Sequence, residues 1–258
     1  MPVVLVLAAH AWSIDAGSAT TRSVRLGAAV GQCRQQRRRA SQAAALADTS
    51  AATLQALASH AADAMRSGRA HVEPAFLSCG ELEAARADML RVFADTTSGD
   101  FESIQTDLLN RAFRQQLPAP PPFAGVLDRL EALRPALARS TSRSLLDGGG
   151  LHLMRYPVGS AFMRHADEDP SLYEPVRNSI SFLLYLTPTD WTDDDGGALV
   201  VFEGGEGAVP RQVMPVGGTL VVYDSRLEHE VLPTQRERHL LSGRFRESDD
   251  DWQRRSSP

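Results

Sequence analysis

The sequence contains no lysine, so all 27 of its basic side chains are arginine. A protein without lysine cannot form the Schiff base that holds pyridoxal phosphate, and it offers neither a P-loop lysine nor a lysine nucleophile. A GC-rich genome is a sufficient explanation for the arginine bias. The composition therefore excludes several enzyme classes without indicating one.

Cysteine and long apolar runs are also scarce. The two cysteines, Cys33 and Cys79, cannot supply a disulfide framework or a cysteine-ligated zinc site. No apolar run approaches the length of about 18 residues that a membrane-spanning helix needs. We therefore expect a protein without a membrane span and without structural disulfides.

The charge is unevenly distributed along the chain. The formal net charge of -5 argues against a general nucleic-acid binder, because such proteins neutralise phosphates with basic side chains. Residues 1–47 nevertheless carry six arginines and one acid, which leaves a balance of -10 for the remainder. The stretch up to Arg39 is rich in Arg, Ser and Ala, as organellar transit peptides are. A disordered tail is the alternative, and a cytoplasmic protein is then favoured.

The length of 258 residues suffices for one main domain and an appendage. We expect an N-terminal extension over 1–70, the main domain over 71–246 and a solvated acidic tail over 247–258. An alanine-rich helix is predicted within the extension, over 41–67. The apolar residues at helical spacing in that helix are Leu54, Leu57, Ala61 and Met65.

Periodicity predicts that the helical part of the domain covers residues 75–140. Ser78 and Glu81 form a capping-box pattern at the start of its first helix. The apolar face of that helix consists of Leu82, Ala85, Met89 and Phe93. Two further amphipathic helices are predicted over 100–117 and 123–140, separated by a proline-rich stretch that stops the first.

The pattern changes after the Asp-Gly-Gly-Gly sequence at 147–150. Residues 151–246 consist of about eight short apolar or alternating runs, cut by Gly, Pro and Asp. This spacing is typical of antiparallel strands in a sandwich or barrel. The sequence therefore predicts a mostly β fold with flanking α-helices.

A His-x-Asp pair, His165 and Asp167, follows one of the predicted strands. On its own, such a pair is also typical of ordinary surface residues. A third candidate, His229, stands 62 residues after Asp167 at the start of another predicted strand. Two histidines and a carboxylate form the facial triad of non-heme Fe(II), whereas a structural zinc site needs four closed ligands. We therefore predict that these three residues bind Fe(II).

Arg238 lies nine residues after His229, on a strand predicted to run back antiparallel. Its guanidinium can point into the same cavity, where it could bind the distal carboxylate of a metal-chelating dicarboxylate. Ser242 faces the same side, because side chains alternate along a strand. Tyr185 lies in an otherwise apolar strand, and a buried tyrosine needs a partner for its hydroxyl. That carboxylate is one candidate, and core packing with the hydroxyl at the rim is the other.

Three stretches resemble the prolyl 4-hydroxylase family of Fe(II)/2-oxoglutarate-dependent dioxygenases, in order and in spacing. They are YPVGSAFMRHAD, SFLLYLTPTDWTDDDGGALVVF and PVGGTLVVYDSRLEHEVLPTQRERHLLSGRF. The likeness is closer to the hypoxia-type prolyl hydroxylases than to the collagen type, in which a lysine generally holds 2-oxoglutarate. It is specific from about Leu151 to Phe245, and a weaker likeness reaches back to about residue 72.

The resemblance implies a double-stranded β-helix (jelly roll) core and an oxidoreductase that uses Fe(II), 2-oxoglutarate and O2, with ascorbate as reductant. The implied metal ligands are His165, Asp167 and His229. Arg238, which completes the catalytic set, and Tyr185 are implied to bind the distal carboxylate of 2-oxoglutarate. Tyr156 would lie beside this cosubstrate, and Ser242 would line its pocket.

Three positions near the substrate depart from the hypoxia-type pattern. Arg244 stands where those enzymes have a tryptophan near the end of the last strand, and Phe162 stands where they have a second pocket tyrosine. Arg177 lies one residue out of register with a substrate-contacting arginine. The resemblance therefore covers the iron and cosubstrate residues better than the substrate rim.

Three functions fit these residues. The first is hydroxylation of prolyl residues in a protein or peptide, with release of succinate and CO2. The second is the same oxygenase chemistry on a small molecule or another side chain, because substrate choice resides in loops. The third is a non-catalytic jelly-roll metal binder, which needs neither Arg238 nor Tyr185. Arg238 favours an enzyme, and the absence of a basic stripe disfavours a nucleic-acid substrate. The resemblance of the stretches DWTDDDGGALVVFE and RLEHEVLP to the family favours the prolyl hydroxylase over the other oxygenases.

Overall fold

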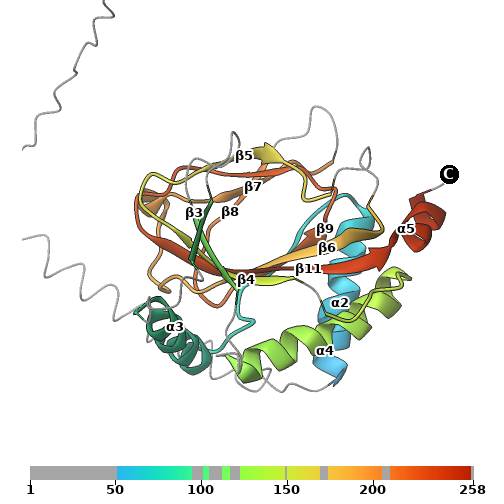
Figure 1. Cartoon of the computed structure of the whole chain (residues 1–258), viewed down its shortest axis with the longest axis horizontal. Helices are drawn as coiled ribbons and strands as arrows, with labels where there is room; N and C mark the ends of the chain where they lie inside the picture. The colour runs from blue at the N-terminus through green and yellow to red at the C-terminus, as the bar shows by residue number, and fades with distance from the viewer. Residues whose placement is uncertain are drawn as a thin grey trace, which may run out of the picture.

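The alternating runs after Leu151 form two facing antiparallel sheets in the computed structural model (Figure 1). The larger sheet has the strand order β1-β9-β6-β11-β4-β3-β2, and the smaller one has the order β5-β10-β7-β8. Helices α2, α3 and α4 lie on the side of the larger sheet that faces away from the smaller sheet. The predicted mostly β fold with a double-stranded β-helix core is confirmed.

The larger sheet contains β1 (His71–Glu73), β2 (Phe101–Ile104), β3 (Ala112–Gln116), β4 (Leu151–Tyr156), β6 (Val176–Tyr185), β9 (Leu220–Asp224) and β11 (Arg238–Ser248). The smaller sheet contains β5 (Phe162–His165), β7 (Leu199–Val201), β8 (Arg211–Val213) and β10 (His229–Val231). The helices are α2 (Ala51–Arg66), α3 (Cys79–Ala94), α4 (Ala124–Thr141), the short 3-10 helix η1 (Asp193–Asp195) and α5 (Asp249–Ser256). The structure describes residues 51–94, 101–104, 112–116, 123–148, 150–168, 174–204 and 210–256.

Strand β6 shows how the two faces of the larger sheet divide the core. Phe182 and Leu184 belong to the apolar cluster that the sheet forms with α2, α3 and α4. Leu183 and Tyr185 belong to the second cluster, between the two sheets. Because successive side chains of a strand point to opposite faces, a central strand with both faces covered is apolar throughout. Full burial of each large apolar side chain contributes roughly 1.5–3 kcal/mol.

The predicted capping box is present at the start of α3. The Ser78 backbone N–H donates to Oε2 of Glu81 at 2.7 Å, and the Glu81 N–H donates to Oγ of Ser78 at 3.3 Å. Both bonds satisfy backbone donors that a helix N-terminus leaves without partners. Of the predicted apolar face, Leu82, Ala85 and Met89 are buried, and Phe93 is partly buried against the same cluster.

The helix predicted over 100–117 is wrong. In the described part of this stretch the chain forms β2 and β3, an antiparallel pair that extends the larger sheet at β4. Without β3, strand β4 would be an edge with a row of unpaired backbone groups. Tertiary pairing of this kind overrides a local helical pattern, because strand preference depends on the neighbouring strands.

The acidic tail expected over 247–258 is instead the end of β11 followed by α5. The Ser248 hydroxyl accepts a hydrogen bond from the Asp251 backbone N–H at 3.2 Å, as an N-cap does. The first turn carries three aspartates and the last turn two arginines, which suits the helix dipole at both ends. Trp252 is buried and fixes the helix to the domain.

The alanine-rich helix expected in the N-terminal extension is α2, which contacts α4 and belongs to the same apolar cluster as the sheet. The predicted apolar face is buried, with Leu54, Leu57, Ala61 and Met65. The predicted targeting segment, Cys33 and residues 41–50 of the predicted helix lie outside the described residues. In the part that the structure describes, no helix is both long and apolar enough to cross a membrane.

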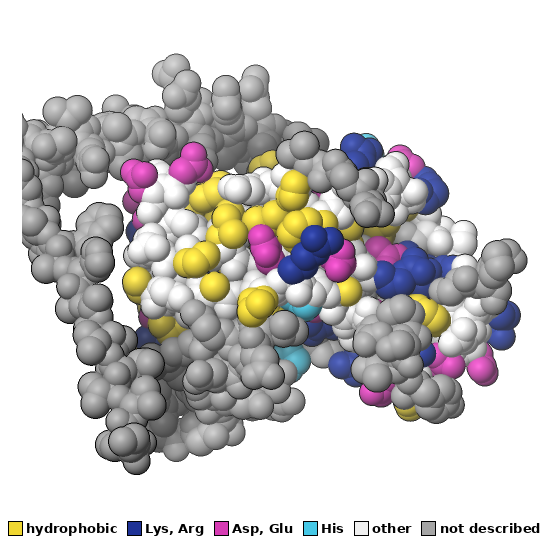
Figure 2. Space-filling view, turned by 90° about the horizontal axis from the view of Figure 1, so that it is seen from above, with side chains coloured by type: hydrophobic (Ala, Val, Ile, Leu, Met, Phe, Trp, Pro, Cys, Tyr) yellow, Lys and Arg dark blue, Asp and Glu magenta, His cyan; other side chains and the backbone are white. Residues whose placement is uncertain are grey.

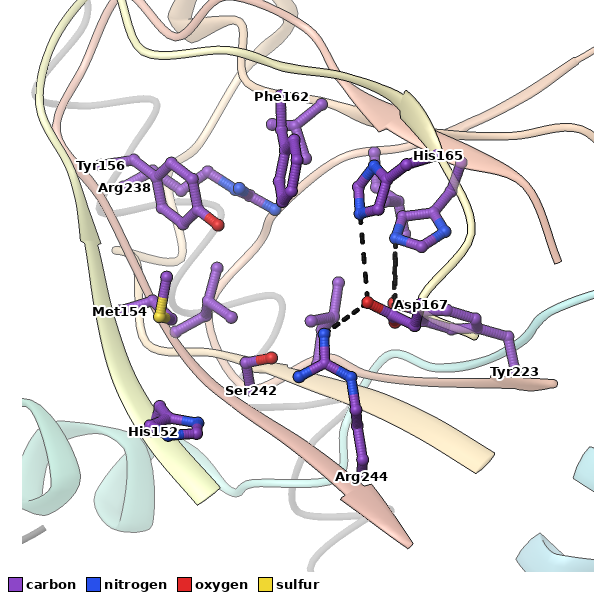
Figure 3. Close-up of a pocket in the computed structure, with 15 residues that line it drawn as sticks. His152, Met154, Tyr156, Phe162, His165, Asp167, Tyr223, Arg238, Ser242 and Arg244 are labelled. Atoms are coloured by element: carbon purple, nitrogen blue, oxygen red, sulfur yellow. Dashed lines mark hydrogen bonds and ion pairs between the residues drawn. The ribbon is translucent and has the colours of Figure 1, made fainter. Parts of the chain in front are cut away.

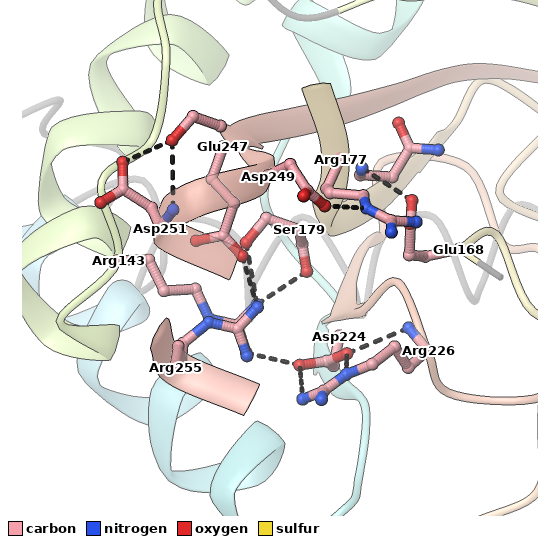
Figure 4. A network of polar contacts seen from close by, with 12 residues as sticks. Arg143, Glu168, Arg177, Ser179, Asp224, Arg226, Glu247, Asp249, Asp251 and Arg255 are labelled. Atoms are coloured by element: carbon pink, nitrogen blue, oxygen red, sulfur yellow. Dashed lines mark hydrogen bonds and ion pairs between the residues drawn. The ribbon is translucent and has the colours of Figure 1, made fainter. Parts of the chain in front are cut away.

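A buried network of charged side chains connects α5 to the sheet (Figure 4). Arg177 is 2% exposed, and its guanidinium binds Glu168 at 2.8 Å and Asp249 at 2.7 Å. The same guanidinium lies over the Trp252 ring, 4.8 Å from the ring centroid. Arg177 therefore occupies an internal structural position and is not one of the residues that line the pocket described below.

We expect Arg177→Met to lower the free energy of unfolding by about 3–5 kcal/mol, because the buried Glu168 and the partly buried Asp249 lose their cation. Urea denaturation followed by circular dichroism measures this change. The control is Arg254→Ala, which removes an exposed partner of Asp251 on the same helix and should cost less than about 1 kcal/mol. Similar effects of the two substitutions would contradict the structural role of Arg177.

Candidate metal centre

A pocket lies between the two sheets and is lined by side chains from both (Figure 3). Its apolar wall includes Leu183, Leu199, Val231 and Leu240. Its polar side chains come from the strands β4, β5, β9, β10 and β11 and from the residues just after β5. The titratable lining residues are His152, Tyr156, His165, Asp167, Tyr223, His229, Arg238 and Arg244.

Strand pairing brings the three predicted metal ligands together in this pocket. His165 ends β5, and His229 begins β10 directly opposite it in the antiparallel pair. Nε2 of His165 lies 4.0 Å from Oδ1 of Asp167, and Nε2 of His229 lies 3.9 Å from Oδ2. One ligand atom of each residue lies within 4.8 Å of the others. The three side chains can therefore hold one metal ion.

Backbone carbonyls orient both histidine rings. Nδ1 of His165 lies 2.8 Å from the carbonyl oxygen of Met163, and Nδ1 of His229 lies 2.9 Å from that of Leu227. A carbonyl only accepts, so Nδ1 is the protonated nitrogen of each neutral ring and Nε2 keeps its lone pair. Burial and the neighbouring His229 lower the pKa of His165, which favours this neutral form. Both Nε2 atoms are thus ready to bind a metal.

Asp167 is a buried carboxylate held by several donors. Burial alone would raise its pKa, but the charge of Arg244 and hydrogen bonds from Arg244 and Ser181 hold the pKa well below its usual range. Arg244 contacts Oδ1, and the Tyr223 hydroxyl donates to Oδ2 at 3.1 Å. The same hydroxyl lies 3.4 Å from Nε2 of His229. Asp167 is therefore ionised and fixed in place.

Arg238 presents unpaired donors to the pocket. Its side chain is 1% exposed, and its Nε and Nη1 have no hydrogen-bond partner among the described residues. Nη2 lies 3.5 Å from the Tyr185 hydroxyl, and the guanidinium lies 5.0 and 5.2 Å from the ring centroids of Tyr156 and Tyr185. Burial raises the pKa of both tyrosines, so their hydroxyls stay protonated. A buried cation with free donors is suited to an anionic ligand.

Gly197, just before β7, allows Arg238 to take this position. Gly197 has φ +69°, and a Cβ there would lie 2.9 Å from Oγ1 of Thr234 and 3.3 Å from Cδ of Arg238. Any larger residue would clash with Thr234 and crowd the stem of Arg238, besides straining the backbone. The close approach at Gly197 is therefore part of how the chain builds the site.

The structure places the remaining predicted residues in or beside the same pocket. Ser242 and Tyr156 line it, whereas Tyr185 is not one of the lining residues and contacts Arg238 through its hydroxyl. Phe162 also lines it, with its ring stacked on His165 at a centroid distance of 3.8 Å.

Two contacts at the metal centre were not predicted from the sequence: Tyr223 was not singled out, and Arg244 was named only as a departure from the family pattern. Tyr223 and Arg244 both contact Asp167. Alternation along β11 could have indicated Arg244, because it stands two residues after Ser242 and six after Arg238, on the same face. Tyr223 had only a weak signal, as a hydroxyl-bearing residue in an apolar strand.

The comparison with protein-family models finds a match over residues 151–246, to the 2OG-Fe(II) oxygenase superfamily. This range holds every residue of the pocket described above. The comparison with curated protein sequences finds no match.

Several solved structures are similar to the protein. A prolyl-4-hydroxylase from Pseudomonas putida is 27% identical with a TM-score of 0.62, over 74% of this chain and 98% of that one. A prolyl hydroxylase from Trichoplax adhaerens, in complex with a hypoxia inducible factor peptide, is 17% identical with a TM-score of 0.63, over 80% and 94% of the two chains. A prolyl 4-hydroxylase from Phytophthora capsici is 19% identical with a TM-score of 0.60, over 78% and 66%. The last two likenesses show the fold alone.

We expect Tyr223→Phe to weaken binding of Fe(II) about tenfold, because it removes a hydrogen bond to a ligand carboxylate without changing the shape of the side chain. Anaerobic calorimetric titration with Fe(II) measures the affinity. Tyr156→Phe, in the same pocket but without a hydrogen bond to the three ligands, should leave metal affinity unchanged. An unchanged affinity in Tyr223→Phe would contradict its role in holding Asp167.

Proposed function

We propose, on the premise that residues 151–246 form a 2OG-Fe(II) oxygenase domain, that the protein is a dioxygenase that hydroxylates prolyl residues of a protein or peptide. The cosubstrate assignment rests on Arg238. Its guanidinium is buried, has two nitrogens without a hydrogen-bond partner among the described residues, and lines the same pocket as the three candidate metal ligands. The prolyl substrate rests on the likeness to the Pseudomonas putida prolyl-4-hydroxylase.

The donor set suits Fe(II). His165, Asp167 and His229 would hold the ion with two imidazole nitrogens and one carboxylate oxygen, a combination typical of non-heme Fe(II) oxygenases. The backbone carbonyls that bind Nδ1 of each histidine keep Nε2 unprotonated and directed at the ion. Tyr223 and Arg244 steady the carboxylate from the other side.

The cosubstrate part of the pocket suits 2-oxoglutarate. Arg238 would hold the distal carboxylate through Nε and Nη1, which have no other partner among the residues described. The Tyr185 hydroxyl is a further donor beside that guanidinium, and Tyr156 and Ser242 would line the site. A carboxylate would thus supply partners that these buried donors lack, at a place where unpaired polar groups are costly.

When bound, Fe(II) and 2-oxoglutarate supply dioxygen activation coupled to the decarboxylation of 2-oxoglutarate to succinate and CO2. The protein would hold the metal and the cosubstrate in place and keep water away from them. Arg238 fixes one end of the cosubstrate, and the three ligands fix the metal. The apolar wall of Leu183, Leu199, Val231 and Leu240 limits access of water. Ascorbate as a reductant stays a prediction.

Exposed apolar side chains on and near the smaller sheet would be available to a peptide ligand. Val158 and Met163 are 63% and 59% exposed, and they flank Phe162, which lines the pocket. Figure 2 looks at the side of the molecule above the smaller sheet, where apolar side chains gather around a small group of arginine and acidic side chains.

A non-catalytic metal binder does not account for Arg238. Such a protein would gain nothing from a buried guanidinium with two unpaired nitrogens, and leaving buried donors unpaired costs about 1–3 kcal/mol each. The same Arg238, in contact with the Tyr185 hydroxyl, is expected in an enzyme that binds a dicarboxylate.

Anaerobic titration of the protein with Fe(II) and 2-oxoglutarate tests the cosubstrate site. We expect a weak visible metal-to-ligand charge-transfer band in the wild type. Arg238→Ala should need about ten to a hundred times more 2-oxoglutarate, because it loses a charge-assisted pair. Arg236→Ala changes an exposed arginine two residues away and should leave the titration unchanged. Metal binding without any band in the wild type would overturn the oxygenase assignment.

Aerobic incubation with a library of proline-containing peptides tests the substrate class. We expect peptides that gain one oxygen atom on proline, detected by mass spectrometry, only when both Fe(II) and 2-oxoglutarate are present. Succinate release that small molecules stimulate, while no peptide is hydroxylated, would contradict the prolyl assignment and leave the oxygenase class intact.

A further inference from the structure

The pocket holds a second arginine at the end opposite Arg238. Arg238 and Arg244 stand six residues apart on β11, which corresponds to about 20 Å along a strand, and both line the pocket. Figure 3 shows the Arg244 guanidinium pointing into the pocket, with one nitrogen on Asp167 and another turned toward Ser242. The cosubstrate arginine and this one therefore serve different ends of the same cavity.

The contact with Asp167 does not use all of the donors of Arg244. The contact is made by Nη2, and Nε has no hydrogen-bond partner within the described part of the chain. The side chain is 30% exposed and lines the pocket, whereas the unpaired Nε is itself buried. An arginine carries five N–H donors in a planar fork and can bind two carboxylates at once.

The charge of the pocket is unbalanced. Its formally charged lining residues are Arg238, Arg244 and Asp167, which leave one positive charge when the histidines are neutral. A divalent iron ion and a doubly negative 2-oxoglutarate cancel each other, so the loaded pocket keeps that positive charge. Charges act more strongly in a pocket with apolar walls than in water, and the excess charge lies at the Arg244 end, because Arg238 faces the cosubstrate.

We propose that the substrate carries a carboxylate that pairs with Arg244, so that the enzyme selects acidic substrates; this rests on the proposed function. The carboxylate can belong to an acidic residue next to the target proline or to the α-carboxylate of the proline itself. Arg244 then steadies Asp167 and determines specificity.

Substrate binding without turnover tests the proposal. The full chain, loaded anaerobically with Fe(II) and 2-oxoglutarate, is titrated calorimetrically with two pairs of probes that differ only in charge. The first pair is Ac-Pro-Asp-NH2 and Ac-Pro-Asn-NH2, for an acidic neighbour. The second is N-acetyl-L-proline and N-acetyl-L-prolinamide, for the α-carboxylate. We expect the acid of at least one pair to bind about tenfold more tightly than its amide.

Two variants assign the preference to Arg244. Arg244→Gln keeps a donor for Asp167 but has no charge, so the acid and the amide should bind equally. Arg244→Lys keeps the charge and should retain most of the preference. The charge-transfer band of each variant shows whether iron and 2-oxoglutarate still bind.

The outcomes separate the two proposals. A normal band in the wild type with equal binding of acid and amide, with no binding of either, or with a preference that survives in Arg244→Gln, would overturn the inference alone. Absence of the band in the wild type would overturn the proposed function and, with it, this inference. A preference for only one probe pair identifies where the substrate carries its carboxylate.

Discussion

Strand β11 is the element on which the rest of the structure depends, because it pairs with β4 on one side and β6 on the other. Its alternate residues Arg238, Leu240, Ser242 and Arg244 face the pocket. The intervening residues face the helices, where Leu241 and Phe245 are buried and Gly243 makes room for the Phe182 ring. A one-residue shift of its register would move both pocket arginines into the apolar core.

Much of the fold after Leu151 could be predicted, because each strand is short, apolar or alternating, and bounded by turn residues. The capping box of α3 and the apolar face of α2 were equally local signals. Strands β2 and β3 could not be predicted this way, because only pairing with β4 makes that stretch a strand. The helical end of the chain, α5, carried a local signal in Ser248 and Asp251, but its buried Trp252 depends on a distant arginine, Arg177.

In the site, too, some residues could be predicted from local sequence patterns, and others only from contacts between distant strands. The His-x-Asp pair, the distant histidine and Arg238 could be predicted, since each follows from a strand and a spacing. The contacts that fix Asp167 were not predicted, because alternation puts Arg244 on the pocket face without saying which acid it meets, and Tyr223 has no spacing signal toward Asp167. The role of Arg177 was left open by its near-register with a family position, and burial places it in an internal ion network. Sequence spacing therefore indicates which groups can meet, and the packed structure decides which of them do.

The orientation of the two histidines has a consequence for how the site can vary during evolution. Each ring is held by the carbonyl of the residue two positions before it, at Met163 and at Leu227. A carbonyl belongs to every residue type, so positions 163 and 227 can drift in sequence while the acceptors remain. Asp167 instead depends on the side chains of Arg244 and Tyr223, which substitution can remove. Sequence variation among relatives of this protein should therefore alter the surroundings of the carboxylate far more readily than those of the imidazoles.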